Sequence, residues 1–351
     1  MANKTQEMYT YVINLFQKEL KEPANRLEKQ RKFFNGFSKF FKAIAIIGGI
    51  IAGVILAIIL ITLGSAYLGY PIGLMYSKNT IAFGLYGGII LASSSWCLHS
   101  IIETAYCTKV KKNLYSKIYQ SLDKSLVYYP GGIKLPIQLY SWERLFFQDP
   151  TSFEVDITQL NRILPYYNYI RTDDVIIGNY EGNSIKIIEF SLIEKRVTHD
   201  SKGRTQTDYY EVFHGALFKT TMAKNIKVPI FINAKNKSSR IPSGFQKINL
   251  ESNEFEKLFD IYSIDQIESR YFFNTKMMDD FIKLRKTTKD EISGFIAGNN
   301  VNLFIHSSKD LFEPDINKPV NDPNTYFDVI FQAKTILDII TKLNLDSKTG
   351  L

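Results

Sequence analysis

The residues with the most potential for chemistry are three acidic residues and one histidine near the middle of the chain. Asp173 and Asp174 open a strand-like segment, Glu189 interrupts the apolar run IKIIEFSLI, and His214 lies in FHG on the segment expected to return beside it. Paired carboxylates can hold a cation or exchange protons, and a carboxylate facing His214 would raise the pKa of its imidazole. Asp174, Glu189 and His214 are therefore the candidate catalytic residues. The alternative is that Asp173 and Asp174 are solvated turn residues and that Glu189 forms a structural ion pair or faces solvent.

The sequence lacks the motifs of the common enzyme classes. It contains no GxxxxGK[ST] phosphate loop, GxGxxG fingerprint, GxSxG elbow or HExxH pair. Its two cysteines form no CxxC pair and its four histidines are far apart: Cys97, Cys107, His99, His199, His214 and His306. We therefore expect no metal and no cofactor, and favour a non-enzymatic protein.

A basic stretch is the other candidate site. No acidic residue occurs between Glu211 and Glu251, and the candidate binding residues there are Lys219, Lys224, Lys227, Lys235, Lys237 and Arg240. Near an anionic membrane surface each such cation contributes roughly 1 kcal/mol, although a solvated loop is the plainer interpretation. Residues 113–351 hold 30 basic and 30 acidic residues, so this part is neutral and nucleic acid is not an expected partner.

Two apolar segments indicate what positions these residues. Residues 43–67 and 80–102 contain no charged side chain, and as helices of about 23–25 residues each is long enough to cross a hydrocarbon core of about 30 Å. Residues 1–112 hold 13 Lys and Arg against 5 Glu, which accounts for the whole net charge of +8. Because the basic residues flank the pair of spans, we expect a membrane hairpin over residues 43–102, with both termini in the cytoplasm.

The flanking segments complete the predicted anchor. Residues 1–42 are predicted to form an amphipathic basic segment. Residues 103–127 are predicted to extend the second span as a helix. Small residues recur at fourth positions of the two spans, and the candidate helix-packing residues are Gly49, Gly53, Gly84 and Gly88. Such faces allow close helix approach in lipid, either between the two spans or in a homo-oligomer.

Residues 128–346 are predicted to form a cytoplasmic α+β domain, followed by a tail at 347–351. Short connections between strand-like segments indicate an antiparallel sheet core with peripheral helices. Separate strands are expected at 208–224 and 228–235, and a hairpin at Gly298 between strands 291–297 and 301–307.

The order of these segments resembles a bacterial family of unknown function, the domain family numbered 3137. The resemblance lies in DDVIIGNYEG, IKIIEFS, EVFHGALF, LESNEFEKLFDIYSIDQIESRY and LFEP, within about residues 128–314. It implies a two-helix anchor with a cytoplasmic domain, recurrent acids at Asp174 and Glu189, and an FxG turn at Phe213 and Gly215. His214 inside that turn departs from the pattern, so the resemblance implies no role for it.

We expect a membrane-anchored, non-enzymatic binding or scaffold module whose partners are the lipid bilayer and a protein in the membrane. Two alternatives remain open at this stage: a membrane-bound hydrolase that uses the Asp/Glu/His residues, and a structural subunit that oligomerises through the glycine faces.

Overall fold

The computed structural model describes residues 2–68, 78–131, 162–199, 203–235, 237, 241–307 and 310–337 except 328, 332, 335 and 336. The chain divides into two compact units. The helical unit comprises residues 20–111 and 314–325, and the sheet unit comprises residues 1–19, 112–313 and 326–351. Each unit is described by itself.

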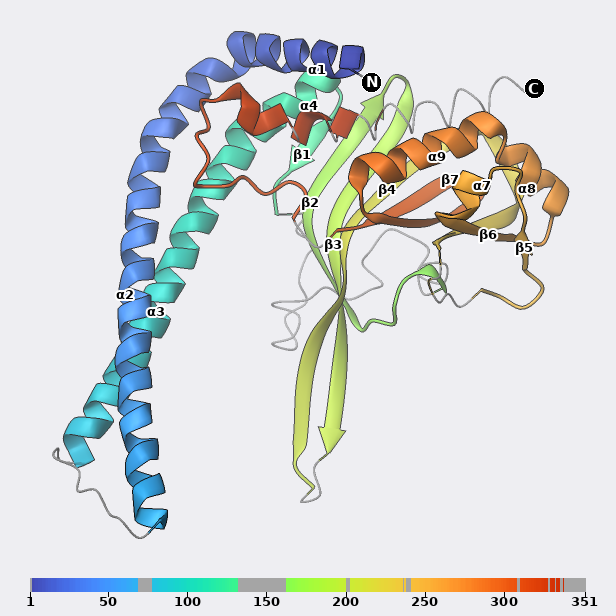
Figure 1. Ribbon diagram of the computed structural model, residues 1–351. Helices are drawn as coiled ribbons and strands as arrows, with labels where there is room; N and C mark the ends of the chain where they lie inside the picture. Colours follow the sequence, from blue (N-terminus) through green and yellow to red (C-terminus); the bar gives the residue numbers. More distant parts are fainter. Residues whose placement is uncertain are drawn as a thin grey trace, which may run out of the picture. The chain divides into compact units, whose positions relative to one another are not determined.

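The helical unit is built on two long helices, α2 (Lys21–Tyr67) and α3 (Lys78–Val110), which form an antiparallel hairpin (Figure 1). Pro23 lies in the first turn of α2, where the missing N–H has no helical partner to lose. Both helices are long and apolar enough to cross a membrane, and only 11% of each apolar window is buried. Most of the apolar side chains in these two windows are therefore exposed.

Small residues set the contact between α2 and α3. A Cβ added at Gly48 would lie 2.8 Å from the Ala92 nitrogen and from the Gly88 oxygen. A Cβ added at Gly84 would lie 2.6 Å from Cδ1 of Ile55. The two backbones therefore approach closely at glycine, as small-residue helix contacts in lipid do.

Residues 314–325 join the helical unit through hydrogen bonds to α2 and α3. The Arg31 guanidinium donates to the Ile316 carbonyl oxygen at 2.9 Å, and the Val320 N–H donates to the Glu28 carboxylate at 3.1 Å. Arg31 and Glu28 also form a two-pronged ion pair, so neither buried charge lacks a partner.

The sheet unit contains a seven-stranded antiparallel sheet with the order β1-β2-β3-β4-β6-β5, and β7 pairs with β4 (Figure 1). The strands are β1 (Val127–Tyr129), β2 (Tyr169–Tyr180), β3 (Asn183–His199), β4 (Thr205–Ala234), β5 (Gln246–Ile248), β6 (Phe259–Ser263) and β7 (Glu291–His306). With the helices below, this confirms the predicted α+β class and antiparallel core.

The central ribbon differs from the prediction in two places. The two strands expected between 208 and 235 are one strand, β4, which pairs with β3 along its first part and with β6 at its end. The hairpin expected at Gly298 is wrong, because β7 continues through it and both parts of β7 pair with β4. Gly298 has φ +60° and lies opposite Ile226 at a register shift, where extra β4 residues are accommodated.

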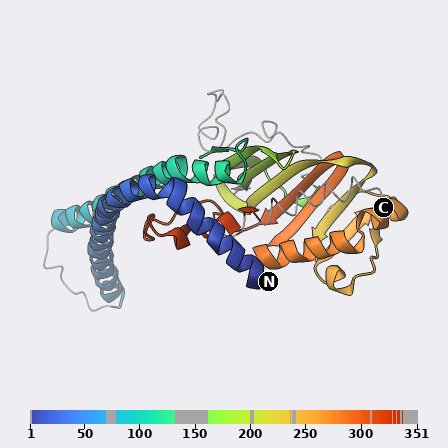
Figure 2. The same ribbon diagram turned by 90° about the horizontal axis from the view of Figure 1, so that it is seen from above.

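Helices and buried aromatic side chains complete the sheet unit. Helices among the described residues also include α1 (Ala2–Leu15), α4 (Ser116–Leu122), α7 (Asn253–Glu256), α8 (Gln266–Phe272) and α9 (Thr275–Thr288), with π-helical turns at Phe16–Leu20 and Lys111–Tyr115. Figure 2 shows α9 lying along the sheet. The core under β3, β4 and β7 includes Phe190, Phe213, Phe231 and Phe304. It holds the backbone of these three strands in place at the site described next.

Candidate functional site

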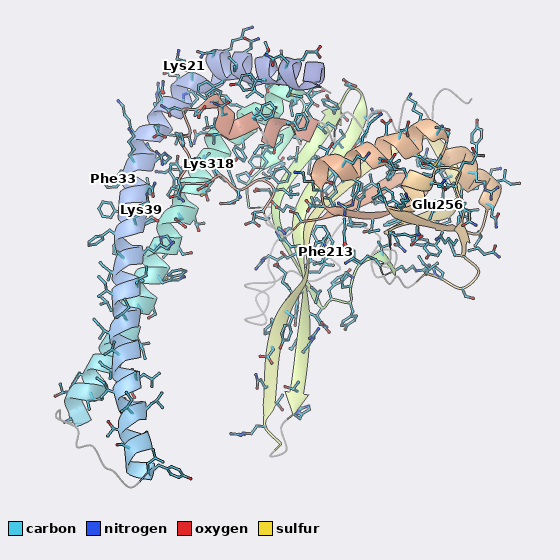
Figure 3. All side chains as sticks on the ribbon, in the orientation of Figure 1. Lys21, Phe33, Lys39, Phe213, Glu256 and Lys318 are labelled. Carbon is cyan, nitrogen blue, oxygen red and sulfur yellow. The ribbon has the colours of Figure 1, made fainter. Side chains whose placement is uncertain are left out.

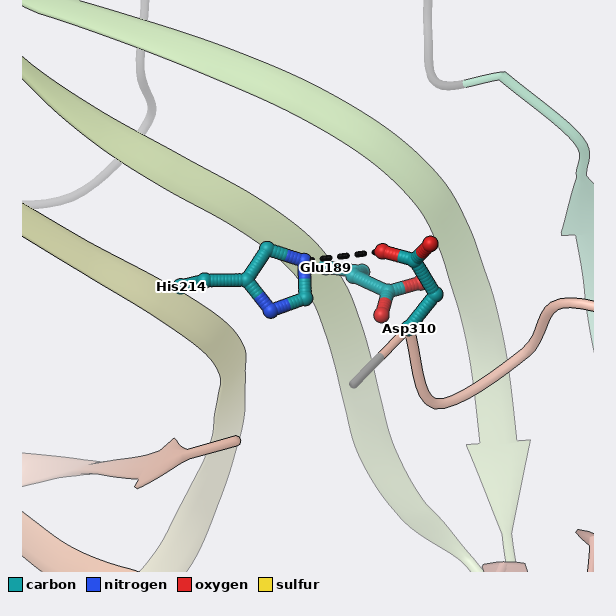
Figure 4. Close-up of side chains that lie close together, drawn as sticks. All are labelled: Glu189, His214 and Asp310. Atoms are coloured by element: carbon teal, nitrogen blue, oxygen red, sulfur yellow. Dashed lines mark ion pairs between the residues drawn. The ribbon is translucent and has the colours of Figure 1, made fainter. Parts of the chain in front are cut away.

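Three side chains from separate segments meet at one face of the sheet unit. Glu189 lies on β3, His214 on β4, and Asp310 shortly after the end of β7 (Figure 4). In each residue one atom that could bind a metal, a carboxylate oxygen or an imidazole nitrogen, lies within 4.8 Å of the corresponding atoms of the other two. The three residues form a cluster of two carboxylates and one imidazole, which we call the Glu189 cluster.

Strand register explains how Glu189 and His214 come together. His214 lies opposite Ser191 and Glu189 lies opposite Ala216. Because side chains two residues apart share a face, Glu189 and His214 are diagonal neighbours rather than the directly facing pair that the sequence suggested. Glu189 and His214 are therefore close together, as predicted, but they are offset by two residues along the strands.

Glu189 is fully buried. Its Oε1 accepts a hydrogen bond from the Leu311 N–H at 2.6 Å, and among the described residues its Oε2 has no hydrogen-bond partner. Burial raises the pKa of Glu189 to about 8, and the nearby carboxylates of Asp174, Asp173 and Asp310 add to the rise, while the Leu311 N–H opposes it. A buried carboxyl in this position retains its proton near neutral pH.

His214 is held by a partner at each ring nitrogen. Its Nε2 lies 3.0 Å from Oδ1 of Asp310, and its Nδ1 lies 2.9 Å from the Ser307 carbonyl oxygen. The carbonyl accepts only, so Nδ1 carries a hydrogen. The bond to Asp310 raises the pKa of His214 to about 9, helped by the Ser307 carbonyl and by Glu189, although burial opposes the shift. Near neutral pH His214 is an imidazolium paired with Asp310.

Asp173 and Asp174 lie on β2 rather than at its start, and they extend the acidic environment of Glu189. Ligand-type oxygens of Asp173, Asp174 and Glu189 also lie within 4.8 Å of one another. Asp174 is fully buried, and its Oδ1 accepts from the Gly131 N–H at 3.1 Å. Burial and the neighbouring Asp174 carboxylate raise the pKa of the Tyr128 hydroxyl. The predicted solvated turn is therefore wrong for Asp174.

Gly215 fixes the backbone beside His214. A Cβ at this position would lie 2.0 Å from the carbonyl oxygen of Ile305 on β7. Close approach of another backbone is a common reason for glycine inside a strand, and the structure shows such an approach here. Because β4 and β7 meet here without a side chain between them, the Ser307 carbonyl that follows β7 can reach His214.

Sequence reasoning missed Asp310. It stands four residues after the end of the apolar strand VNLFIH, and it is the acidic residue that follows β7 most closely. Its position after a strand end is a usable signal, but the pairing of β7 with β4 was needed to place it beside His214.

The basic stretch does not form a row of unpaired cations among the described residues. Lys235 and Lys247 both contact Asp260, at 2.8 and 2.7 Å, and Lys237 lies 2.9 Å from Glu291. Of the other predicted residues, Lys219 lies on β4 and the Lys227 N–H donates to Glu268; Arg240 and the side chain of Lys224 lie outside the described residues. Lipid binding by this stretch remains a prediction.

The predicted helix-packing glycines separate into two groups. Gly84 and Gly88 on α3 lie at the contact with α2, whose own close glycine is Gly48. A Cβ added at Gly49 or Gly53 would meet no atom within 4 Å. The face of α2 that carries Gly49 and Gly53 is therefore not the face that packs on α3.

A cavity of about 340 Å³ lies elsewhere in the sheet unit. Its lining includes Asn233, Lys237, Glu291 and His306, but no member of the Glu189 cluster. The Glu189 cluster therefore stands apart from this cavity. What the cluster can do chemically is hold protons or a cation between fixed carboxylates and one imidazole.

A family match covers part of this site. The family model described as a protein of unknown function, DUF3137, matches residues 211–345, which include His214 and Asp310 but not Asp174 or Glu189. No curated protein matches the sequence. The crystal structure of the mycobacterial trehalose monomycolate transport factor A, TtfA, aligns with 56% of this chain and 84% of that protein, at 8% identity and a TM-score of 0.30. The resemblance predicted from the sequence is therefore confirmed: residues 211–345 of this chain match DUF3137, a family of unknown function.

Proposed function

We propose that this chain is a membrane-anchored, non-enzymatic binding module that engages a membrane-associated protein or anionic lipid at the inner leaflet of a bacterial cytoplasmic membrane. The supporting observation is the apolar surface of α2 and α3. Its exposed side chains include Ile50, Val54, Leu60, Ile61, Leu63, Phe83, Tyr86, Ile90, Trp96 and Ile101. Apolar area on this scale is unfavourable in water and is removed by lipid.

The proposed topology places both termini and the sheet unit in the cytoplasm, because basic residues flank the two apolar spans, 43–67 and 80–102, and only Lys78 stands between these spans. The test uses single cysteines in a chain with Cys97 and Cys107 changed to Ser. A membrane-impermeant maleimide should label Lys78→Cys on intact cells, and His199→Cys only after permeabilisation. Labelling of His199→Cys on intact cells would refute the orientation.

The start of α2 is the better-supported lipid contact. Phe33, Phe37 and Phe40 are exposed, and Figure 3 shows Phe33 and Lys39 projecting from α2. Lys29, Lys32 and Lys39 are exposed as well. Aromatic rings beside cations suit the interface of an anionic bilayer. The paired state of Lys235 and Lys237 weakens the corresponding argument for the sheet unit.

The lipid test compares two variants of equal charge in nanodiscs of phosphatidylglycerol or phosphatidylcholine. One carries Gln at Lys29, Lys32 and Lys39, and the other carries Gln at Lys227, Lys235 and Lys237. The melting temperature of the wild type should be higher in phosphatidylglycerol, and that difference should shrink only in the first variant. If the difference in melting temperature shrinks only in the second variant, the lipid contact lies on the sheet unit and not at the start of α2.

Each alternative function has one supporting observation. For a hydrolase it is the Glu189 cluster, although Glu189 is fully buried and the described cavity has a different lining. For an oligomerising subunit it is the open face of α2 at Gly49 and Gly53. Gly49→Leu with Gly53→Leu should leave the cross-linked species unchanged if the binding-module proposal alone is right.

A further inference from the structure

We propose that Glu189, His214 and Asp310 bind one divalent transition-metal cation, Zn²⁺ or Mn²⁺, which ties strands β3 and β4 to the segment that follows β7. The proposal is independent of membrane topology and of the partner proposed above. It concerns a site that neither the sequence motifs nor the family match assigns.

The first argument is the geometry of the three donors. A ligand-type atom of each residue lies within 4.8 Å of the other two, and Nε2 of His214 is 3.0 Å from Oδ1 of Asp310. Metal–ligand distances for imidazole nitrogen and carboxylate oxygen are about 2.0–2.2 Å, so donors around one cation lie somewhat over 3 Å apart. Binding of one cation would therefore draw the three donors closer together than they lie now.

The second argument is the state of Glu189. Its Oε2 is buried, and among the described residues it has no hydrogen-bond partner. A buried carboxylate oxygen is normally hydrogen-bonded, paired with a cation or bound to a metal. Glu189 belongs to the same cluster as the imidazole of His214, and a cation bound there would give this carboxylate the partner that it lacks.

The third argument is the way the donors are oriented. The Ser307 carbonyl accepts from Nδ1–H of His214, so Nε2 is the nitrogen directed toward the carboxylates. The Leu311 N–H likewise fixes Oε1 of Glu189 at 2.6 Å. Metal-binding histidines and carboxylates are typically held by such hydrogen bonds to the backbone. A cation would take the place of the proton that now lies between His214 and Asp310.

The donor set selects the class of metal. One imidazole with carboxylates suits Zn²⁺ or Mn²⁺, whereas Mg²⁺ and Ca²⁺ prefer oxygen donors alone. Asp310 is 55% exposed at its side chain, which gives a cation a route from solvent. Asp173 and Asp174 lie in the adjoining acidic group with Glu189 and are a source of further oxygen donors.

The experiment uses the full chain in nanodiscs, purified without a polyhistidine tag and stripped with chelator. Zn²⁺, Mn²⁺ and Ca²⁺ are each titrated by calorimetry, and melting temperature is recorded with and without metal. The expected result is one Zn²⁺ or Mn²⁺ per chain with a higher melting temperature, and weaker binding of Ca²⁺. Asp310→Asn and His214→Gln should each weaken Zn²⁺ or Mn²⁺ binding at least 10-fold.

His306→Gln is the matched control, because His306 lies 3.7 Å from Glu291 on the same sheet but outside the cluster. It should bind metal as the wild type does. Asp310→Asn changes a surface side chain, and its metal-free melting temperature shows whether the fold is intact. The proposal is wrong if the wild type binds no metal, if Ca²⁺ binds as tightly as Zn²⁺ and Mn²⁺, or if both cluster variants bind like the wild type.

Discussion

The contact between α2 and α3 makes a sharp prediction, because neighbouring glycines on α2 differ in what they face. Alanine at Gly48 would place its Cβ 2.8 Å from the backbone of Gly88 and Ala92, whereas ordinary contact begins at 3.4 Å. Alanine at Gly49 would meet no atom within 4 Å. Both substitutions gain the same helix propensity, about 1 kcal/mol, but only the first must push two backbones apart.

The expected magnitude follows from that difference. Overpacking of a tight contact costs about 1–3 kcal/mol, so Gly48→Ala should lower the free energy of unfolding by about that much relative to Gly49→Ala. Gly88→Ala against Gly87→Ala repeats the comparison on α3, because Gly87 also faces open space. Reversible unfolding in mixed micelles, followed by circular dichroism, measures both pairs. Equal stabilities within each pair would refute the close backbone contact.

The sheet unit gives two further predictions. Burial alone would raise the pKa of Asp260, but hydrogen bonds from Lys235 and Lys247 lower it below the ordinary value of 3.8. The ionised Asp260 therefore stabilises the folded state above pH 3.8, and this stabilisation is lost as the pH falls through the folded-state pKa. Asp260→Asn should therefore cost about 1 kcal/mol in urea unfolding at pH 7 and progressively less in acid, whereas a cost independent of pH would contradict these ion pairs. Gly215→Ala, whose Cβ would lie 2.0 Å from the Ile305 oxygen, should cost more than about 3 kcal/mol or prevent folding, and an unchanged melting temperature would show that β4 and β7 are not in contact there.

The parts of the fold that sequence reasoning predicted are those with a strong local pattern. The charge-free stretches predicted α2 and α3, and the short connections predicted antiparallel pairing of β2, β3 and β4. The hairpin at Gly298 failed because an αL glycine serves a two-residue turn and a bulge equally well. Only the partner strand decides between them, and β4 continues along both parts of β7.

The same distinction explains which residues of the candidate site were found. Glu189 was conspicuous because a charge within an apolar strand requires a partner, and His214 because it lies on the segment expected to return beside that strand. Asp310 has no local peculiarity: it is an exposed acid in a polar segment, and only the pairing of β4 with β7 brings it to His214. Long-range pairing of this kind cannot be derived from periodicity, which reports one segment at a time.

The burial of Glu189 bears on why the sheet unit keeps an ionisable carboxyl group in its interior. A glutamine of the same size would still accept the Leu311 N–H without the desolvation that burial imposes on a carboxylate. Burial raises the pKa of Glu189, and repulsion from the several carboxyl groups around it adds to that rise. Such an arrangement is unfavourable for a purely structural interior. It becomes favourable once a cation neutralises the carboxylates, and this is the physical reason to regard the cluster as a binding site and not as a defect of packing.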